Sequence, residues 1–231
     1  MKRIAILGTG GVGQTLASKF LESGYEIMLG TRNVEAKLSI STKDQYGNPP
    51  FKDWFAANKG AKLGTLKEAA AFGEIILNAT KGSESINALK AVELKDIDGK
   101  ILIDIANPLD FSMGMPPRLI PELCNTNSLA EEIQRSFPKA RVVKTMNTMW
   151  SGLMINPGLV NRGDHNIFIC GNDAEAKESV KFFLKSFGWS EKNILDLGDI
   201  SAARATEMYL PLWLRISAAT NYKPMNLRIV N

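Results

Sequence analysis

The stretch Lys2-Arg3-Ile4-Ala5-Ile6-Leu7-Gly8-Thr9-Gly10-Gly11-Val12-Gly13 decides the fold that this sequence predicts. An apolar run typical of a strand leads directly into a glycine-rich turn, and a helical pattern follows from Gln14 to Ser23. In such a turn the first glycine permits the tight bend, the second lets the backbone approach a pyrophosphate, and the third lets the helix pack closely on the sheet. The N-terminus of that helix attracts anions. The stretch therefore predicts a dinucleotide site whose phosphates are held by Gly8, Thr9, Gly10, Gly11, Val12 and Gly13.

The end of the next apolar run, residues 25–29, indicates which dinucleotide binds. In NAD sites an acidic residue about 20 residues beyond the glycines accepts hydrogen bonds from the ribose 2′-hydroxyl. Here Gly30, Thr31 and Arg32 stand in that place. A guanidinium offers the planar set of donors that suits phosphate oxygens. We therefore predict NADP(H) rather than NAD(H), with a 2′-phosphate held by Thr31, Arg32, Asn33 and Lys37. A solvated surface arginine is the alternative interpretation of Arg32.

Length and composition limit the number of domains. A chain of 231 residues with 45% hydrophobic content buries a substantial core but has no room for two full domains. We predict an NADP-binding Rossmann domain over residues 1–150, with residues 151–231 forming a small C-terminal part that completes the sheet and the acceptor site.

Charge, cysteines and hydropathy exclude several classes of partner. The net charge of +4 is scattered and gives no nucleic-acid surface, and Cys124 and Cys170 lack the spacing of a metal site. No leader or membrane-spanning run is recognised, so we expect a cytoplasmic protein without membrane or nucleic-acid partners.

Strand patterns recur between helical patterns along the whole chain, which predicts an α/β fold of the doubly wound Rossmann type, with a mostly parallel sheet and a small C-terminal extension. Capping sequences at Thr65 and Ser128 predict helix starts. Residues 34–60 and 108–121 are interpreted as loops, the first with a short helix over 51–58, and residues 226–230 as an edge strand. The strand candidates are residues 3–7, 26–29, 74–80, 100–106, 141–146, 166–170 and 194–196.

Polar residues follow the strands at the edge where ligands bind in an open α/β sheet. They predict further contacts to the cofactor from Asn78, Ala79, Thr80, Lys81, Ser83, Asn107 and Pro108. The alternative is that these side chains only satisfy backbone groups at strand ends.

No constellation for acid–base catalysis is evident. His165 stands beside Gly163 and Asp164 and is interpreted as a turn residue, and no Tyr-x-x-x-Lys pair occurs. Lys81 and Lys144 are candidate proton donors, although each also fits a solvated or phosphate-binding lysine. Hydride exchange between a nicotinamide and a flavin-like ring needs mainly stacking and orientation. We therefore expect no catalytic side chain.

These motifs resemble the NADPH-dependent reductases of the deazaflavin coenzyme F420 over nearly the whole chain. The segment 142–148 is closer to the NADPH-binding domains of the six-transmembrane epithelial antigen metalloreductases, which pass hydride to FAD. The resemblance implies a homodimer and an acceptor site at the end of the fifth predicted strand, at Asn147, Thr148 and Met149. Asn147 stands where the deazaflavin reductases carry histidine, which leaves FAD, FMN and coenzyme F420 open as acceptors. The resemblance rests on residues 8–14, 29–33, 103–108 and 171–173.

Two other functions remain open. One is a small carbonyl or imine reductase, which shares the glycine pattern but usually has a long helical domain. The other is an NADP(H) sensor without turnover. The predicted helix over residues 201–219 is more apolar than one buried face requires, so it is expected to form a dimer interface, to line the acceptor pocket, or to pack on its own sheet.

Overall fold

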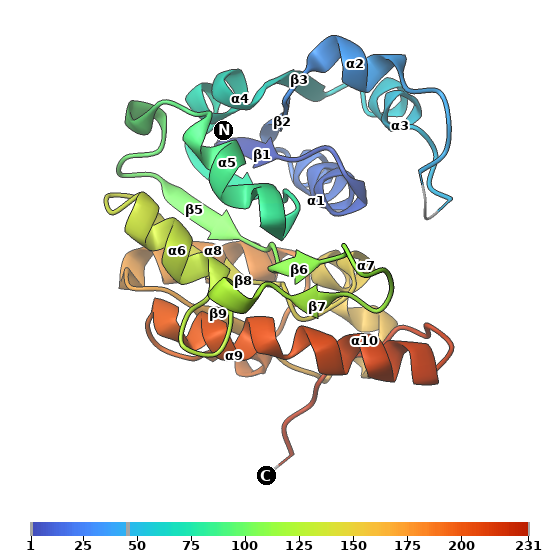
Figure 1. Ribbon diagram of the computed structural model, residues 1–231, viewed down its shortest axis with the longest axis vertical. Helices are drawn as coiled ribbons and strands as arrows, with labels where there is room; N and C mark the ends of the chain where they lie inside the picture. Colours follow the sequence, from blue (N-terminus) through green and yellow to red (C-terminus); the bar gives the residue numbers. More distant parts are fainter. Residues whose placement is uncertain (1, 45–46, 231) are drawn as a thin grey trace.

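The computed structural model describes residues 2–44 and 47–230 and has the predicted doubly wound α/β architecture (Figure 1). Within these residues an eight-stranded sheet has the order β10-β9-β8-β5-β4-β1-β2-β3. Its strands are β1 (Arg3–Leu7), β2 (Glu26–Thr31), β3 (Ala61–Thr65), β4 (Ile75–Asn78), β5 (Ile101–Asp104), β8 (Arg141–Thr145), β9 (Ile167–Cys170) and β10 (Ile194–Asp196). The helices are α1 (Gly11–Glu22), α2 (Val34–Ser39), α3 (Phe51–Ala57), α4 (Leu66–Phe72), α5 (Ser85–Lys90), α6 (Leu129–Ser136), α7 (Ser151–Ile155), α8 (Ala174–Ser186), α9 (Ala203–Met208) and α10 (Leu210–Ala219).

Both faces of the sheet are buried, because alternate residues of each strand enter two different hydrophobic layers. In β1, Ile4 and Ile6 pack with residues of α1, α3, α7 and α8, while Ala5 and Leu7 pack with α4, α5, α6 and α9. This covering on both faces makes the central strands continuous apolar runs, as the sequence predicted.

The chain reverses direction across the sheet between β1 and β4. From β1 it continues outward through β2 to β3, and it then returns to β4 on the other side of β1. The carboxyl ends of β1 and β4 therefore flank the crevice in which ligands of doubly wound folds bind.

The C-terminal residues extend the same sheet. β9 pairs antiparallel with β8, and β10 pairs parallel with β9, so the sheet is mostly parallel. The division into residues 1–150 and 151–231 stays a prediction. No helix in the described part of the chain is long and apolar enough to cross a bilayer.

The segment after β2 is more ordered than the sequence predicted. The expected helix at 51–58 is present as α3, but residues 34–39 form α2 and residues 61–65 form edge strand β3. Asn33 explains α2, since its side chain accepts a hydrogen bond from the Ala36 backbone N–H at 2.8 Å. β3 escaped recognition because Lys62 and Gly64 interrupt its apolar pattern. Residues 45–46 of the predicted loop lie outside the described residues.

The predicted loop over 108–121 contains a short hairpin, β6 (Leu109–Asp110) and β7 (Arg118–Leu119). Asp110 stabilises it by accepting hydrogen bonds from the Ser112 backbone N–H at 2.8 Å and from Arg118 Nε at 3.0 Å. The hairpin places Phe111 beside the carboxyl ends of the central strands.

The helix predicted over 201–219 is divided into a 3₁₀ turn and helices α9 and α10, with Pro211 in the first turn of α10, where its missing N–H costs nothing. The predicted edge strand at 226–230 is wrong. Asn226 instead donates a hydrogen bond to the Asn166 carbonyl, and the Ile229 N–H donates to the Asn166 side chain. Leu212 on α10 is 56% exposed, and the homodimer stays a prediction.

Candidate functional site

The glycine-rich turn is packed so closely that two of its glycines have no room for a side chain. Gly8 has φ +119°, and a Cβ there would collide with the carbonyl of Ala79. A Cβ on Gly13 would collide with the carbonyl of Gly8. These contacts fix the end of β1 against both the loop after β4 and the first turn of α1.

The remaining glycines of the turn border open space. A Cβ built on Gly10 or Gly11 meets no heavy atom within 4 Å. Gly10 precedes α1 without a side-chain cap, and the first turn of α1 has no acidic residue. Backbone N–H groups at the start of a helix form a favourable environment for an anion. The turn therefore fits a dinucleotide pyrophosphate.

The residues predicted to hold a 2′-phosphate lie at the end of β2 and in α2. The Arg32 side chain is 82% exposed, and its Nη1 lies 3.9 Å from Glu84 Oε2. The Asn33 side chain caps α2, and Lys37 Nζ lies 5.3 Å from the centre of the Phe51 ring. Burial lowers the pKa of Lys37, although Asp44 opposes that shift. Arg32 is thus the cation in this group that reaches furthest into solvent.

A pocket opens between the glycine-rich turn, the loop after β4 and the loop after β5. Phe111, from the hairpin, forms part of its wall. In the described part of the chain, Lys81 is the one titratable side chain of its lining, which otherwise combines apolar groups with hydroxyls and one amide. The lining residues are Val12, Ala79, Thr80, Lys81, Gly82, Ser83, Ile105, Ala106, Asn107, Leu109 and Phe111.

Asn78, predicted to contact the cofactor, is fully buried beneath this pocket. Its Nδ2 donates to Asp104 Oδ1 at 2.8 Å and to Ser85 Oγ at 3.1 Å. Its Oδ1 accepts a hydrogen bond from Thr80 Oγ1 at 2.7 Å. The structure therefore places Thr80 at the pocket surface and Asn78 as its support.

Lys144 is neither solvated nor available to a phosphate, which corrects both interpretations of that residue. Its side chain is completely buried, with Nζ 2.7 Å from Asp104 Oδ2 and 2.8 Å from Glu207 Oε1. Lys144 Nζ also donates to the Ala106 carbonyl. All three ammonium protons thus have acceptors within the protein, and Lys144 has no proton donor role at the pocket surface.

Burial and neighbouring charges shift the pKa values of Lys144 and Glu207. Burial alone would lower the pKa of Lys144, but the negative charges of Asp104 and Glu207 more than offset burial and raise it. Burial raises the pKa of Glu207, with Lys144 opposing the shift. Glu207 also accepts hydrogen bonds from the Leu129 and Ala130 N–H groups at 2.8 and 3.2 Å. The N-terminus of α6 thereby helps to compensate the excess negative charge.

The segment predicted to bind an acceptor is closed to solvent. Asn147, Thr148 and Met149 are 3%, 2% and 6% exposed. Asn147 and Asn107 share two hydrogen bonds, one from Asn107 Nδ2 to the Asn147 carbonyl at 2.8 Å and one from Asn147 Nδ2 to Asn107 Oδ1 at 2.9 Å. Asn107 therefore joins the end of β8 to the pocket, and the buried Pro108 follows it.

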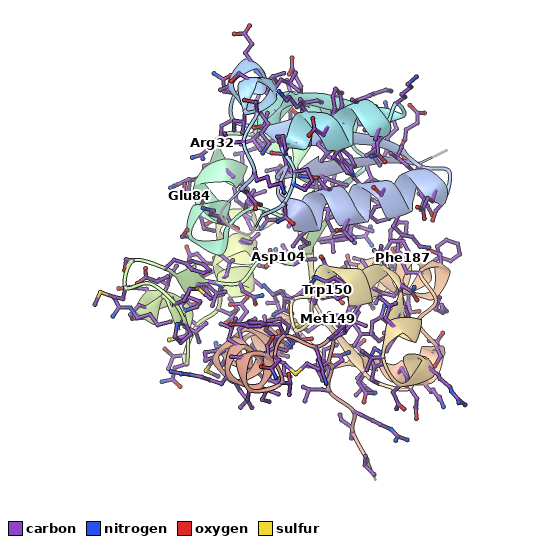
Figure 2. The ribbon with its side chains drawn as sticks, turned by 90° about the vertical axis from the view of Figure 1, so that its right-hand side faces the viewer. Arg32, Glu84, Asp104, Met149, Trp150 and Phe187 are labelled. Atoms are coloured by element: carbon purple, nitrogen blue, oxygen red, sulfur yellow. The ribbon has the colours of Figure 1, made fainter. Side chains whose placement is uncertain are left out.

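Figure 2 shows how the labelled parts of the site are distributed. Arg32 and Glu84 lie together in the upper half, Asp104 lies below them, and Met149 and Trp150 lie lower still.

Sequence reasoning missed several residues of the site. Phe111 and Leu109 were hidden in a presumed loop, and Gly82 was not singled out although a Cβ there would collide with the Asn107 carbonyl. The Asp104–Lys144 pair had a usable signal, since two apolar runs end in opposite charges. Glu207 had none, because its burial depends on the packing of α9.

Other polar candidates are structural. His165 is 1% exposed, its Nε2 lies 2.9 Å from the Pro157 carbonyl, and its ring packs edge-on against Trp189. Burial raises the pKa of Cys170 to about 12, so its thiol is unreactive near neutrality. The described residues contain no group of three or more potential metal ligands.

Comparison with known proteins identifies the family. Residues 3–108 match the family model described as NADP oxidoreductase, coenzyme F420-dependent. A crystal structure from Arthrobacter sp. FB24, solved as a candidate F420-dependent NADP reductase, is 46% identical to this chain, covers 100% of both chains and has a TM-score of 0.93. The chain therefore belongs to the coenzyme F420-dependent NADP oxidoreductase family. It is an NADP-dependent oxidoreductase, which confirms the resemblance predicted from the sequence.

More distant relatives of this NADP oxidoreductase differ in length. The F420-dependent NADP reductase of Methanocaldococcus jannaschii is 26% identical over 237 residues, which cover 99% of this chain and 98% of that protein. Metalloreductase STEAP3 of Rattus norvegicus is 26% identical over 217 residues, covering 91% of this chain but 38% of the rat protein. Solved imine reductases and a reductive aminase share only the fold, at 17–18% identity and TM-scores of 0.60–0.63.

The burial of Lys144 leads to a stability prediction. Lys144→Met should lower the free energy of unfolding by about 3 to 5 kcal/mol, because it leaves Asp104 and Glu207 as uncompensated buried charges. The measurement is urea unfolding at neutral pH. Lys139→Met is the control, since Lys139 is 76% exposed in its ion pair with Asp98 and should cost less than about 1 kcal/mol. Equal stability of the two variants would contradict the assigned role of Lys144.

Proposed function

We propose that this oxidoreductase transfers hydride between NADPH and a flavin or deazaflavin acceptor, with coenzyme F420 as the leading candidate. The observation that carries the proposal is the open glycine turn that leads into a pocket whose lining offers one amine, hydroxyls, an amide and apolar groups. Such a lining can orient a planar ring but supplies no paired acid and base. The names of the F420-dependent relatives support the choice of acceptor.

The predicted residues divide the work of binding along the cofactor. Arg32, with Thr31, Asn33 and Lys37 nearby, would hold the 2′-phosphate. The backbone of residues 8–13 would hold the pyrophosphate. Thr80, Lys81 and Ser83 would contact the ribose, and Asn107 and Pro108 would shape the floor beneath the nicotinamide. The bound nicotinamide supplies the hydride, and the chain holds the ring against the acceptor and excludes water.

The acceptor would lie beside Phe111, and the buried segment 147–149 would support that site from beneath. Phe111 is 45% exposed in the pocket wall and offers an aromatic face to a planar ring. Asn147 would act through Asn107, to which it is bound by two hydrogen bonds. FAD and FMN are the alternatives, and FAD is the acceptor that the metalloreductase resemblance of residues 142–148 implies.

A carbonyl or imine reductase is the second candidate, and Lys81 is the observation that favours it. This lysine lines the pocket and could donate a proton to a small substrate. An NADP(H) sensor without turnover is the third candidate. These candidates differ in which compounds consume NADPH.

An anaerobic absorbance assay distinguishes the candidates. NADPH is mixed in separate cuvettes with FAD, FMN, coenzyme F420, a cyclic imine and a small ketone, with NADH as the control donor. We expect NADPH-specific loss of absorbance of coenzyme F420 or a flavin. NADPH consumption with only the imine or the ketone would favour the second candidate. Tight NADPH binding without turnover in any cuvette would favour the sensor.

The exposed position of Arg32 predicts its effect on nucleotide choice. Arg32→Ala should narrow the difference in binding free energy between NADPH and NADH by about 1 to 3 kcal/mol, because a charge-assisted phosphate contact is lost. Titration calorimetry measures both affinities. Arg135→Ala, which removes the same charge from α6, is the control. Equal affinities of the wild-type protein for the two nucleotides would refute the 2′-phosphate site.

The open space at Gly10 predicts separate effects on folding and binding. Gly10→Ala should leave the melting temperature unchanged, since a Cβ there meets nothing within 4 Å, yet it should weaken NADPH binding by placing a methyl group where the pyrophosphate lies. Gly13→Ala is the matched comparison and should lower the melting temperature through its collision with Gly8. Unchanged NADPH affinity in Gly10→Ala would place the pyrophosphate elsewhere.

A further inference from the structure

We propose that a buried network of positioning residues fixes both rims of the pocket for hydride transfer. The rims are Thr80, in the loop after β4, and Ala106, in the loop after β5. The network consists of Glu207, Lys144, Asp104 and Asn78. The proposal rests on the function proposed above and deepens it. None of the four residues belongs to the pocket lining, so each would act through its neighbours rather than by touching the cofactor.

The network starts at α9, which contributes no residue to the pocket lining. Glu207 of α9 is 1% exposed and binds Lys144 through Oε1, while both of its oxygens accept N–H groups from the start of α6. Its carboxylate is therefore held from three directions. A carboxamide cannot replace it without loss, because the amide nitrogen of glutamine would face donors.

Lys144 connects Glu207 to the rim after β5. Lys144 on β8 donates to Asp104 Oδ2 and to the Ala106 carbonyl, and Asp104 Oδ1 accepts the Ala106 N–H at 3.2 Å. Both backbone polar groups of Ala106 are thus tied to buried side chains. Ala106 lines the pocket directly, next to Asn107.

The final link reaches the rim after β4. Asp104 Oδ1 accepts a hydrogen bond from Asn78 Nδ2, and Asn78 Oδ1 accepts hydrogen bonds from the hydroxyl and the N–H of Thr80, at 2.7 and 3.3 Å. This pairing fixes the orientation of the Asn78 amide, and through it the rotamer of Thr80. The two rims, at Thr80 and Ala106, are consequently set by one buried network.

Stability alone does not account for such a cluster. Buried ion pairs and triads are often no more stabilising than apolar residues of similar volume, since desolvation offsets the attraction between the charges. A fixed geometry is what the network adds, because Lys144 and Asp104 bind the backbone of Ala106, and Asn78 binds Thr80. Hydride transfer is sensitive to displacements of about 1 Å between reacting atoms.

A neighbouring ion pair provides the matched control. Arg204, also on α9, donates to Glu131 of α6 at 2.9 and 2.6 Å, and Glu131 is 7% exposed. This pair joins the same two helices as Glu207 does. Glu131 also accepts a hydrogen bond from Ser128 Oγ, and neither Glu131 nor Ser128 lines the pocket.

The decisive comparison is Glu207→Gln against Arg204→Gln. Three quantities are measured for each full-length variant: the melting temperature, the affinity ratio between NADPH and adenosine 2′,5′-bisphosphate, and the rate of NADPH oxidation at saturating NADPH with the acceptor found for the wild type. The bisphosphate lacks the nicotinamide half, so the ratio isolates that half. We expect Glu207→Gln to lower the saturated rate about tenfold to a hundredfold and to reduce the ratio, with bisphosphate affinity unchanged. Arg204→Gln should change only the melting temperature.

Thr80 supplies a second test at the pocket end of the network, because this residue is only partly buried. Thr80→Val should lower the saturated rate and the affinity ratio as Glu207→Gln does. Thr80→Ser, which keeps the hydroxyl, should have the rate and the ratio of the wild type. The double variant Glu207→Gln/Thr80→Val should lose little more than either single variant, because both substitutions break one network.

The proposal is overturned if Glu207→Gln and Arg204→Gln have equal rates and affinity ratios, or if the effects of Glu207→Gln and Thr80→Val multiply. Should Glu207→Gln fail to fold, an unchanged ratio in Thr80→Val overturns it. If none of the tested acceptors supports NADPH oxidation by the wild-type protein, the proposed function fails, while the affinity ratios still test the positioning network.

Discussion

The buried ammonium of Lys144 is the constraint on which the carboxyl edge of this sheet depends. Three acceptors meet at one nitrogen: Asp104 on β5, the Ala106 carbonyl in the loop after β5, and Glu207 on α9. A charge without water must be met by groups of fixed geometry, so the ends of β5 and β8 and helix α9 have little freedom to shift relative to one another. The shape of the pocket depends on this arrangement, because Ala106 lines the pocket and Asp104 is connected through Asn78 to Thr80.

Steric exclusion at the glycine turn complements this electrostatic constraint. Gly8 and Gly13 draw β1, α1 and the loop after β4 together, and Gly82 does the same for the two loops that border the pocket. Gly10 and Gly11 have the opposite role, since they leave space where a phosphate can approach the backbone. The site thus combines a rigid frame of close contacts with one open cradle, as preorganised binding requires.

The parts of the site that depend on local chemistry could be predicted from the sequence. The glycine turn could be recognised because its conformation depends on a few adjacent residues. Membership of the F420-dependent family agrees with the NADP-binding fold predicted from that turn. The Lys144 network could not be predicted, because Glu207 lies 63 residues beyond Lys144 and meets it only after α9 packs on the sheet. The strand predicted for the C-terminal tail is absent from the described residues 226–230 for a related reason. The alternation of Leu227 and Ile229 is typical of a strand, yet in the described part of the chain the backbone of these residues binds only Asn166.

A crystal structure of the protein with bound NADP⁺ would test the proposed cofactor site. We expect the 2′-phosphate within hydrogen-bond distance of Arg32 and the pyrophosphate against the N–H groups of residues 10–12. We also expect the nicotinamide between Thr80 and Asn107, with the contacts of Lys144 unchanged. A nicotinamide bound outside this pocket, or a Lys144 side chain released from Asp104 and Glu207 in the complex, would contradict the proposed site and its supporting network.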